Sequence, residues 1–572
     1  MAILNPLTRS EFLKLSAAAA GAALAGGHRT VGAAGVFADT VLVGGKVVMM
    51  DAADSTVQAL AIRAGLIDQV GTDAAIMALA GPATQVIDLR GRTVTPGLID
   101  SHLHFQVVPQ FGGFYIDFLP PAVSTLAAMQ DKLAAEVAKV PAGTWIQAVF
   151  TAIDDVQAPT RQQLDVVSPE HPVFMMQLGG HYATANSAAL AIAKITAETP
   201  NPTGGIIERD DQGELTGLLY NHQAMDMVRR WSPRYGDERI VEGIITTQPL
   251  FAGVGVTSYH DTNIRGAATI ADYQKIAKAG KMSLRSALYF TLEYPTDLPI
   301  ALDDLEHYED PFCRLAGAKF LIDGQTPTAY CYEPHNGVSW QTTTWDQTAF
   351  KQAVRALHDA GMQIAVHCAG DKSVDLVLDA YEEAMNANPR PDPRHRIEHC
   401  ILSKPESTQR IKDLGVCIST QPQFIRMGGD YYPTIFGSER MSRMMVTREW
   451  LDAGIPVAIS SDAPTTPWHQ PQVALAAAVA RRTPTGVEVG PEQAMTVHEA
   501  LRAHTATAAY LAHDEATRGS LEAGKLADLV VWTVDPYGMY PKDLQLATVD
   551  LTMVGGVPVY QGPREPRRRL RS

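Results

Sequence analysis

Two histidines separated by one residue are the most informative chemical feature of the sequence. His102 and His104 close an apolar segment, residues 96–104, that reads PGLIDSHLH. In an extended strand, residues two positions apart point to the same face, so both imidazoles would project side by side from one strand end. Neutral imidazole nitrogens are good ligands for transition metals, and the pair therefore predicts part of a metal site.

Further side chains that could complete such a site accompany later apolar runs. His260 follows the second run, Lys319 lies in the fourth, and His367 ends the fifth. His399 ends the sixth run, and Asp462 follows the eighth. Each has an ordinary structural alternative, because strand-end histidines make structural hydrogen bonds, buried lysines pair with carboxylates, and aspartates cap helices. Their joint placement favours one shared site, since a hydrolytic metal centre requires histidines and carboxylates at one edge.

The eight apolar runs alternate with segments of helical character, which is the pattern of repeated βα units. The predicted strands cover residues 94–99, 255–259, 284–290, 315–322, 363–367, 395–399, 416–420 and 456–460. They predict an α/β fold, a (β/α)8 or TIM barrel, over residues 96–515. Residues 105–247 exceed what a barrel needs after its first strand. We expect this large insertion to form a lid or wall over the barrel mouth, where active sites lie.

Short strands and glycine-rich turns flank the barrel on both sides. Residues 39–95 contain TVLVGGKVVM, and residues 516–562 contain DLVVW and LTMVGGVPVY. Both regions favour hairpins. We therefore expect them to pair into one small β-sandwich built from both chain ends.

Composition limits the kinds of protein that this chain can be. It has 572 residues, 46% of them hydrophobic, and a formal net charge of −15. The charge argues against a nucleic-acid partner, and no run approaches the ~18 apolar residues of a membrane span. The five cysteines match no Cys-x-x-Cys site, so we expect buried thiols rather than a disulfide scaffold. The basic tail, residues 563–572, is typical of a solvated terminus.

Residues 1–38 are typical of a leader rather than of a folded segment. Residues 8–14 read TRSEFLK and precede a weakly hydrophobic run of alanine and glycine. This resembles a twin-arginine export signal, although Ser10 stands where the second arginine belongs, so the match is degenerate. We expect export to the periplasm, with a disordered leader on a cytoplasmic protein as the alternative.

Finer motifs resemble those of the amidohydrolase superfamily, in the branch that includes N-substituted formamide deformylase. They are GGH at residues 179–181, GVTS at 255–258, a lysine and DG at 319–324, HCAGD at 367–371, RIEH at 396–399 and SDAP at 461–464. The resemblance covers about residues 40–562. It implies six metal ligands, which are His102, His104, Lys319, His367, His399 and Asp462.

The resemblance also implies a chemistry for these residues. Zinc is the expected metal, with two ions bound, while iron, manganese and nickel stay open. Lys319 would be carbamylated by CO₂, because a carbamate can bridge two cations whereas an ammonium cannot bind one. Asp462 would accept a proton from metal-activated water and pass it to the leaving nitrogen. Position alone makes His181 and His260 the expected substrate contacts: His181 lies in the insertion, where its alternative role is to order that segment, and His260 lies at the second strand end, although the family's usual ligand set omits it.

The combined pattern predicts a metal-dependent hydrolase that cleaves a non-peptide C–N bond of a small molecule, in an amide, N-acyl or N-formyl group. An ester, lactone or carbamate hydrolase with the same metal site is the alternative, since the same hydroxide attacks these groups. A non-catalytic ligand-binding barrel is a third interpretation, which the presence of Asp462 disfavours. A homodimer is expected only because such assemblies are common.

Overall fold

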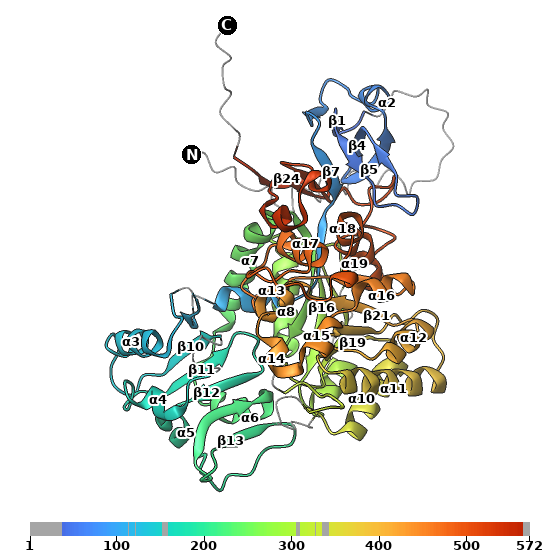
Figure 1. Cartoon of the computed structure of the whole chain (residues 1–572). Helices are drawn as coiled ribbons and strands as arrows, with labels where there is room; N and C mark the ends of the chain where they lie inside the picture. The colour runs from blue at the N-terminus through green and yellow to red at the C-terminus, as the bar shows by residue number, and fades with distance from the viewer. Residues whose placement is uncertain are drawn as a thin grey trace.

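The structure, a computed structural model, covers most of the chain. It describes residues 37–111, 114–120, 122–151, 158–304, 309–325, 328–334 and 343–563. Residues 1–36 of the expected leader and 564–572 of the expected basic tail lie outside the described residues. Figure 1 shows a central barrel, a small sandwich at the top of the view, and an insertion at the lower left.

Eight parallel strands form the central sheet. They are β8 (Leu98–Leu103), β15 (Val256–Ile264), β16 (Arg285–Leu292), β18 (Cys313–Leu321), β19 (Gln363–Cys368), β20 (Arg396–His399), β21 (Cys417–Thr420) and β22 (Val457–Ile459), paired in this order. β17 (Glu309–Asp310) adds an antiparallel edge to β18. Backbone bonds join the two ends of the sheet, since Asp462 N donates to His102 O (2.9 Å) and His104 N donates to Ala463 O (2.8 Å). The expected (β/α)8 barrel is confirmed.

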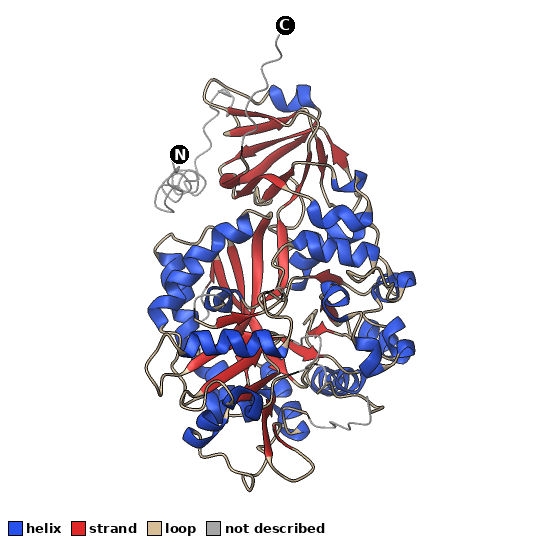
Figure 2. Ribbon diagram, turned by 60° about the vertical axis from the view of Figure 1, so that its left-hand side comes forward, coloured by secondary structure: helices blue, strands red, loops and turns tan. Residues whose placement is uncertain are grey.

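Helices alternate with these strands and surround them (Figure 2). The longer ones are α7 (Asp237–Ala252), α8 (Ala267–Lys278), α10 (Gln347–Asp359), α11 (Asp371–Ala387), α12 (Pro405–Asp413) and α17 (Pro471–Ala480). The shorter ones are α9 (Asp297–Pro299), α13 (Gln423–Gly428), α14 (Tyr432–Phe436), α15 (Ser438–Ser442), α16 (Thr447–Asp452), α18 (Val497–Ala503) and α19 (Ala506–Leu511). In α10, Phe350, Val354 and Leu357 recur at helical spacing and are buried. Asp346 caps this helix by accepting from the Ala349 N–H at 2.9 Å.

The first barrel strand begins later than the sequence pattern predicts. The single strand expected over residues 94–99 is divided at Gly97 into β7 (Thr93–Pro96) and β8. Gly97 N donates to Asp528 O in the sandwich, whereas Leu98 N donates to Gly255 O in the barrel. A Cβ atom at residue 97 would lie 2.1 Å from Thr257 Oγ1, so only glycine lets the chain pass here. The pairing partner therefore changes from sandwich to barrel at this residue.

Both ends of the described chain build the sandwich. One sheet contains β5 (Leu66–Gly71), β4 (Ala59–Arg63), β1 (Thr40–Val43) and β6 (Gln85–Asp88), in that order. The other contains β25 (Val557–Gln561), β24 (Val549–Val554), β23 (Leu529–Trp532), β7, β2 (Lys46–Val48) and β3 (Thr56–Val57). Leu42 and Leu60 from the first sheet share a buried core with Val94, Leu529 and Met553 from the second. Burial of this apolar surface holds the two sheets together.

The chain between β8 and α7 folds around a sheet of its own. Its strands are β9 (Ile116–Phe118), β10 (Ile146–Phe150), β11 (Val173–Gln177), β12 (Tyr182–Ala185), β13 (Ile206–Arg209) and β14 (Leu215–Tyr220). Helices α3 (Leu126–Val137) and α4 (Arg161–Asp165) share one core with Met175, while α5 (Ser187–Ile192) and α6 (Asn221–Arg229) share the other with Met176. Met175 and Met176, which are neighbours in β11, thus point to opposite faces of the sheet, as successive residues of a strand do.

Two expectations from composition concern the described part of the chain. Among its residues, no helix has both the length and the apolar character that crossing a membrane requires. The five cysteines are all buried and form no disulfide, which confirms the expected thiols.

Candidate metal centre

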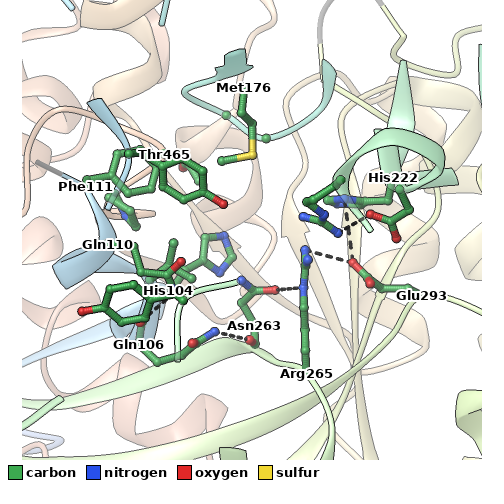
Figure 3. A pocket seen from close by; sticks show the side chains of 18 of the residues that line it. His104, Gln106, Gln110, Phe111, Met176, His222, Asn263, Arg265, Glu293 and Thr465 are labelled. Carbon is green, nitrogen blue, oxygen red and sulfur yellow. Dashed lines mark hydrogen bonds and ion pairs between the residues drawn. The ribbon is translucent and has the colours of Figure 1, made fainter. Parts of the chain in front are cut away.

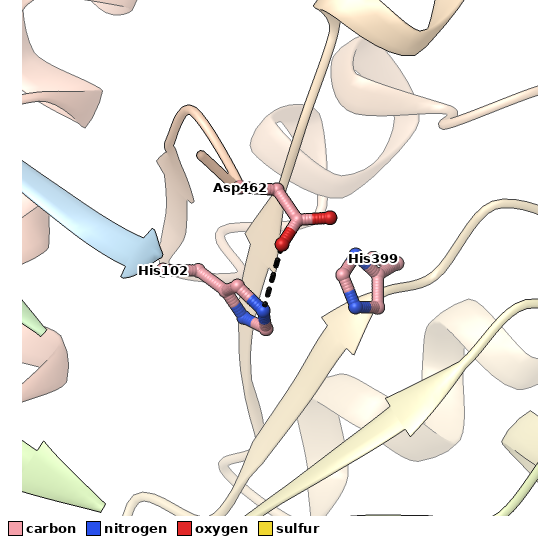
Figure 4. Close-up of side chains that lie close together, drawn as sticks. All are labelled: His102, His399 and Asp462. Carbon is pink, nitrogen blue, oxygen red and sulfur yellow. Dashed lines mark ion pairs between the residues drawn. The ribbon is translucent and has the colours of Figure 1, made fainter. Parts of the chain in front are cut away.

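Three side chains from distant parts of the sequence meet at the carboxyl ends of the barrel strands (Figure 4). His102 comes from β8, His399 from the end of β20, and Asp462 from the loop after β22. One ligand atom from each lies within 4.8 Å of the others, and all three residues are buried. Two ring nitrogens and a carboxylate oxygen at this spacing suit a divalent transition metal.

The backbone holds His399 and Asp462 in a conformation that side chains rarely adopt. φ is +69° at His399 and +54° at Asp462. Such positions cost about 1–3 kcal/mol each and persist where the surrounding structure enforces them. Asp462 is fixed by its bond to His102 O and by Thr465 N, which donates to Asp462 O at 2.8 Å. The hydrogen bonds that close the barrel therefore also place this carboxylate beside His102.

Asp462 faces both histidines of the His-x-His motif. Its Oδ1 lies 3.1 Å from His104 Nε2 and 3.5 Å from His102 Nε2. The two imidazole centroids are 5.4 Å apart. His102 is fully buried, whereas His104 lines a cavity. The structure thus places the two motif histidines at different depths beside one carboxylate.

His367 brings a fourth imidazole to the group. Its ring centroid lies 4.4 Å from that of His399. His399 Nδ1 donates to Gln421 Oε1 at 2.6 Å, which leaves the opposite ring nitrogen with a free electron pair. Asp323 Oδ1 lies 3.4 Å from His367 Nε2, and this carboxylate is held in turn by the Gly370 N–H at 2.9 Å.

Several polar atoms of this group are buried without a hydrogen-bond partner. They are His102 Nε2, His104 Nδ1, His367 Nε2 and Asp462 Oδ1. Leaving a buried polar atom unsatisfied costs about 1–3 kcal/mol, so four such atoms in one place indicate a ligand that satisfies them. A divalent cation fits this set, because neutral imidazoles and a carboxylate are the donors that it binds.

Burial keeps the imidazoles in the form that binds metals. It lowers the pKa of His102 and of His367 well below the ordinary value, and the pKa of His399 to about 4. Burial by itself raises the pKa of Asp462, but the neighbouring His104 and His102 outweigh it and hold that pKa well below its ordinary range. At neutral pH the site therefore presents neutral nitrogens and a charged carboxylate.

Lys319 reaches the same cavity from β18. The residue is only 2% exposed, and burial lowers the pKa of its ammonium group to about 8. The negative charges of Glu398 and Asp462 oppose this shift without cancelling it. Burial therefore makes the neutral amine of Lys319 more accessible than that of a solvated lysine.

A carboxylate without a predicted role orients His102. Glu398 Oε2 accepts a hydrogen bond from His102 Nδ1, which fixes the tautomer and leaves Nε2 facing Asp462. Arg396 holds Glu398 with two bonds, from Nε to Oε1 (2.7 Å) and from Nη2 to Oε2 (2.9 Å). The RIEH motif contained a signal for this pair, because alternate residues of a strand share one face.

His260 lies deeper than its sequence position suggests. β15 runs to Ile264, beyond the expected strand end at residue 259, so His260 sits within the strand. Its Nδ1 accepts from Arg396 Nη1 at 3.1 Å, and His260 is not among the described residues that line the cavity. Its expected contact with the substrate stays a prediction. The hydrogen bond from Arg396 instead favours a role for His260 in holding the Arg396–Glu398 pair in place.

A cavity of about 730 Å³ opens from the cluster, and both the barrel and the insertion line it. The metal-site residues that line it are His104, Lys319, His367, His399 and Asp462. The insertion contributes Met176, Leu178 and His181, and Met176 stands above the cavity in Figure 3. This volume suits a small-molecule ligand.

His181 brings the insertion next to the metal cluster. It follows Gly180, whose φ of +74° turns the chain into β12, and its ring centroid lies 4.8 Å from that of His367. Burial lowers the pKa of His181 to about 3, so its imidazole is neutral. A neutral imidazole can donate one hydrogen bond and accept another, which suits contact with an amide.

Comparison with known proteins adds an independent finding. The sequence pattern of the amidohydrolase family matches residues 85–560. The chain is 30% identical over 538 residues to N-substituted formamide deformylase of Arthrobacter pascens, covering 91% of this chain and 98% of that protein. It is 30% identical over 549 residues to Protein LONG AFTER FAR-RED 3 of Arabidopsis thaliana, covering 92% of each. An uncharacterized metal-dependent hydrolase from Pyrococcus horikoshii shares the fold, with a TM-score of 0.69 at 22% identity over 88% of this chain and 99% of that one.

Proposed function

Because this chain belongs to the amidohydrolase family, we propose that it is a metal-dependent hydrolase of a non-peptide C–N bond, in a small N-acyl or N-formyl amide. The observation that carries the proposal is the cluster of His102, His399 and Asp462, with unpartnered buried atoms, beside a cavity. The similarity to a protein named for deformylation of N-substituted formamides supports the type of bond.

Zinc is the proposed metal, as one or two ions. With two ions, His102, His104 and Asp462 would hold the deeper one, and His367 and His399 would hold the second. A single ion would be held by His102, His399 and Asp462, whose ligand atoms lie within 4.8 Å of one another. When bound, the metal would polarise the acyl carbonyl and lower the pKa of a water molecule towards ~7.

Asp462 is the proposed proton carrier. Its carboxylate is charged at neutral pH and would accept a proton from the attacking water, then give it to the leaving nitrogen. The remaining hydroxyl bonds to the acyl carbon as the C–N bond breaks, so amide and water become a carboxylic acid and an amine. The backbone bonds at Asp462 N and Asp462 O would keep the carboxylate in place through both proton transfers.

Lys319 is the proposed bridging ligand, as a carbamate. Its neutral amine would attack CO₂, forming an N–C bond and releasing one proton, and the product carries one negative charge over two oxygens. The lowered pKa of about 8 supports this proposal, because only the neutral amine is nucleophilic.

His181 is the proposed contact for the substrate carbonyl. Its neutral ring lies near His367 and lines the cavity, so its N–H can donate to an oxygen held there. Such a donor stabilises the negative charge that develops on the acyl oxygen.

Hydrolysis of small amides with and without a chelator tests the proposal. N-formylbenzylamine, N-acetylbenzylamine and the matched ester benzyl acetate are incubated with zinc-loaded protein, and the released products are measured. We expect amide cleavage that disappears after dialysis against a chelator and returns with zinc. Amide cleavage that survives complete metal removal would contradict the proposal, and cleavage of the ester alone would replace it by the esterase alternative.

A further inference from the structure

A second group of charged side chains lies in the same cavity. We call it the polar cluster; its members are His222, Asp226, Arg229, Arg265 and Glu293. The first three belong to helix α6 of the insertion, whereas Arg265 follows β15 and Glu293 follows β16 of the barrel. Figure 3 shows His222, Arg265 and Glu293 pointing towards one another, on the opposite side of the view from Gln110 and Phe111.

The charges of the polar cluster are already balanced within it. Arg265 Nη2 lies 2.9 Å from Glu293 Oε1, and Arg229 Nη2 lies 2.5 Å from Asp226 Oδ1. Arg265 Nε also donates to Asn263 Oδ1 at 3.0 Å, which fixes the plane of the guanidinium group. Two cations and two anions therefore leave no net charge for an ionic ligand to neutralise.

Apart from the polar cluster and the metal-site residues Lys319 and Asp462, three charged residues line this cavity, and all three are exposed. They are Arg230, Arg234 and Asp237. Because solvent screens exposed charges, these residues contribute little to the field at the polar cluster.

His222 supplies the sign that the polar cluster is incomplete. The residue is 7% exposed, and its Nδ1 is buried without a hydrogen-bond partner. The nearest oxygen of Glu293 is 3.8 Å away, which is too far for a hydrogen bond. Burial, followed by the charges of Arg265 and Arg229, lowers the pKa of His222 well below its ordinary value, so this ring is a neutral donor and acceptor. The side chain of Arg265 is 31% exposed and so offers further N–H groups to the cavity.

The polar cluster and the metal centre line the same cavity, so one small molecule could contact both. Asn221, the residue before His222, donates its N–H to His181 O at 2.8 Å. His181 in turn places its ring 4.8 Å from that of His367. One short connection therefore joins the cluster to the reacting end of the cavity.

We infer that the polar cluster binds an uncharged group with both a hydrogen-bond donor and an acceptor, such as a carboxamide or ureido group, at the end of the substrate remote from the scissile bond. This inference rests on the proposed function. The acceptor oxygen would face the Arg265 guanidinium, and the donor N–H would face Glu293 or His222. A carboxylate would meet the charge of Glu293, and an ammonium group would meet that of Arg265, so both would bind more weakly.

Binding of metal-anchored probes tests this inference without requiring turnover. Hydroxamates chelate metal ions through two oxygens, so para-substituted benzohydroxamic acids share one anchor and differ only at the remote group. Carboxamide, carboxylate, aminomethyl and methyl versions are titrated into the zinc-loaded full-length protein by calorimetry. We expect the carboxamide to bind about tenfold more tightly than the other three, the size of one or two hydrogen bonds to charged groups.

Two variants shift the preference in opposite directions. Glu293→Gln leaves Arg265 without its anion, so the carboxylate probe should gain about tenfold relative to the carboxamide. Arg265→Gln leaves Glu293 without its cation, so the aminomethyl probe should gain instead. Glu488→Gln is the matched control, because Glu488 pairs with Arg482 on the surface and lies outside the cavity, and it should alter neither ratio.

Binding of acetohydroxamate, which has no remote group, tests the proposed metal centre separately from the polar cluster. If acetohydroxamate fails to bind the zinc-loaded protein, the proposed metal centre is wrong and this inference falls with it. If it binds while the four benzohydroxamates bind equally, or while the carboxylate binds best to the wild type, only the inference is overturned. Its binding to each variant also reports whether that variant retains a folded site.

Discussion

Glu398 and His102 are 296 residues apart in the sequence and share a hydrogen bond inside the barrel. His102 belongs to the first barrel strand and Glu398 to the sixth, so the contact requires the folded barrel. The carboxylate accepts a hydrogen bond from the Nδ1–H group, which leaves the Nε2 electron pair on the side that faces Asp462. The strand arrangement of the closed barrel therefore also orients His102 as a metal ligand.

Glu398→Gln should weaken metal binding and, because it leaves the buried Arg396 without its anion, also lower the Tm. Glutamine keeps the shape but cannot offer the charge that strengthens His102 as a ligand, and loss of such a partner typically lowers metal affinity 10–100-fold. Titration of zinc against a competing chelator measures this change. Unchanged affinity would mean that Glu398 serves only the packing of Arg396.

Asp462→Asn should abolish most activity with little change in the fold. Asparagine cannot accept the proton from water, and loss of a general base costs about a hundredfold to ten-thousandfold in rate. Turnover of N-formylbenzylamine, with zinc content measured in parallel, checks the result. Asp452→Asn is the control, because Asp452 is an exposed partner of Arg448 and should leave the rate unaltered. Wild-type turnover by the Asp462 variant would remove this residue from the mechanism.

The positions of the barrel strands could be predicted because buried parallel strands leave apolar runs that end in polar residues. His367 and Asp462 illustrate this, since each stands where its run ends. The end of the second strand could not be predicted in this way, because His260, Asp261 and Thr262 are polar yet lie buried in β15, which continues to Ile264. The predicted strand end therefore placed His260 nearer the barrel mouth than the structure does.

The polar cluster could not be predicted from the sequence, for a related reason. Arg265 lies past the predicted end of its strand, at residue 259, and His222 lies in a helix of the insertion. The paired strands β15 and β16 bring Arg265 and Glu293 together, and only the packing of the insertion against the barrel adds His222. Spacing along one chain segment carries no information about such a contact.

Asp528→Asn should destabilise the docking of the sandwich on the barrel. Arg285 Nε donates to Asp528 Oδ2 (2.7 Å) and Nη2 donates to Oδ1 (3.0 Å), and both side chains are less than 5% exposed. Breaking a buried pair by removing one charge costs about 3–5 kcal/mol. Thermal unfolding around neutral pH should therefore show a clearly lowered Tm, while the surface variant Glu488→Gln should shift stability by less than about 1 kcal/mol.

The same pair has a defined pH dependence. Burial opposes the charged form of Asp528, but Arg285 outweighs it and lowers the pKa below the ordinary 3.8. A lowered pKa in the folded state means that the stabilisation is present above pH 3.8 and is lost as the pH falls through the folded-state value. The Tm difference between the wild type and Asp528→Asn should shrink only in that acidic range. A difference that already disappears near neutral pH would contradict this assignment.

The cysteines should be unreactive in the native protein. Burial raises the pKa of Cys313, Cys331, Cys400 and Cys417 to about 12, and raises that of Cys368 well above its ordinary value. Because the thiolate is the reactive form, a chromogenic disulfide reagent at mildly alkaline pH should titrate none of them before unfolding and all five in denaturant. Rapid reaction of any native thiol would show that its surroundings open readily.

An anomalous-scattering map of zinc-reconstituted crystals, recorded across the zinc edge, shows whether the side chains of the candidate metal centre bind the metal. We expect one or two peaks enclosed by His102, His104, His367, His399 and Asp462, with extra density at the end of Lys319 where a second ion binds. Zinc peaks found only elsewhere in the molecule would contradict the proposed metal centre. So would a fully zinc-loaded crystal in which these side chains bond to one another and enclose no peak.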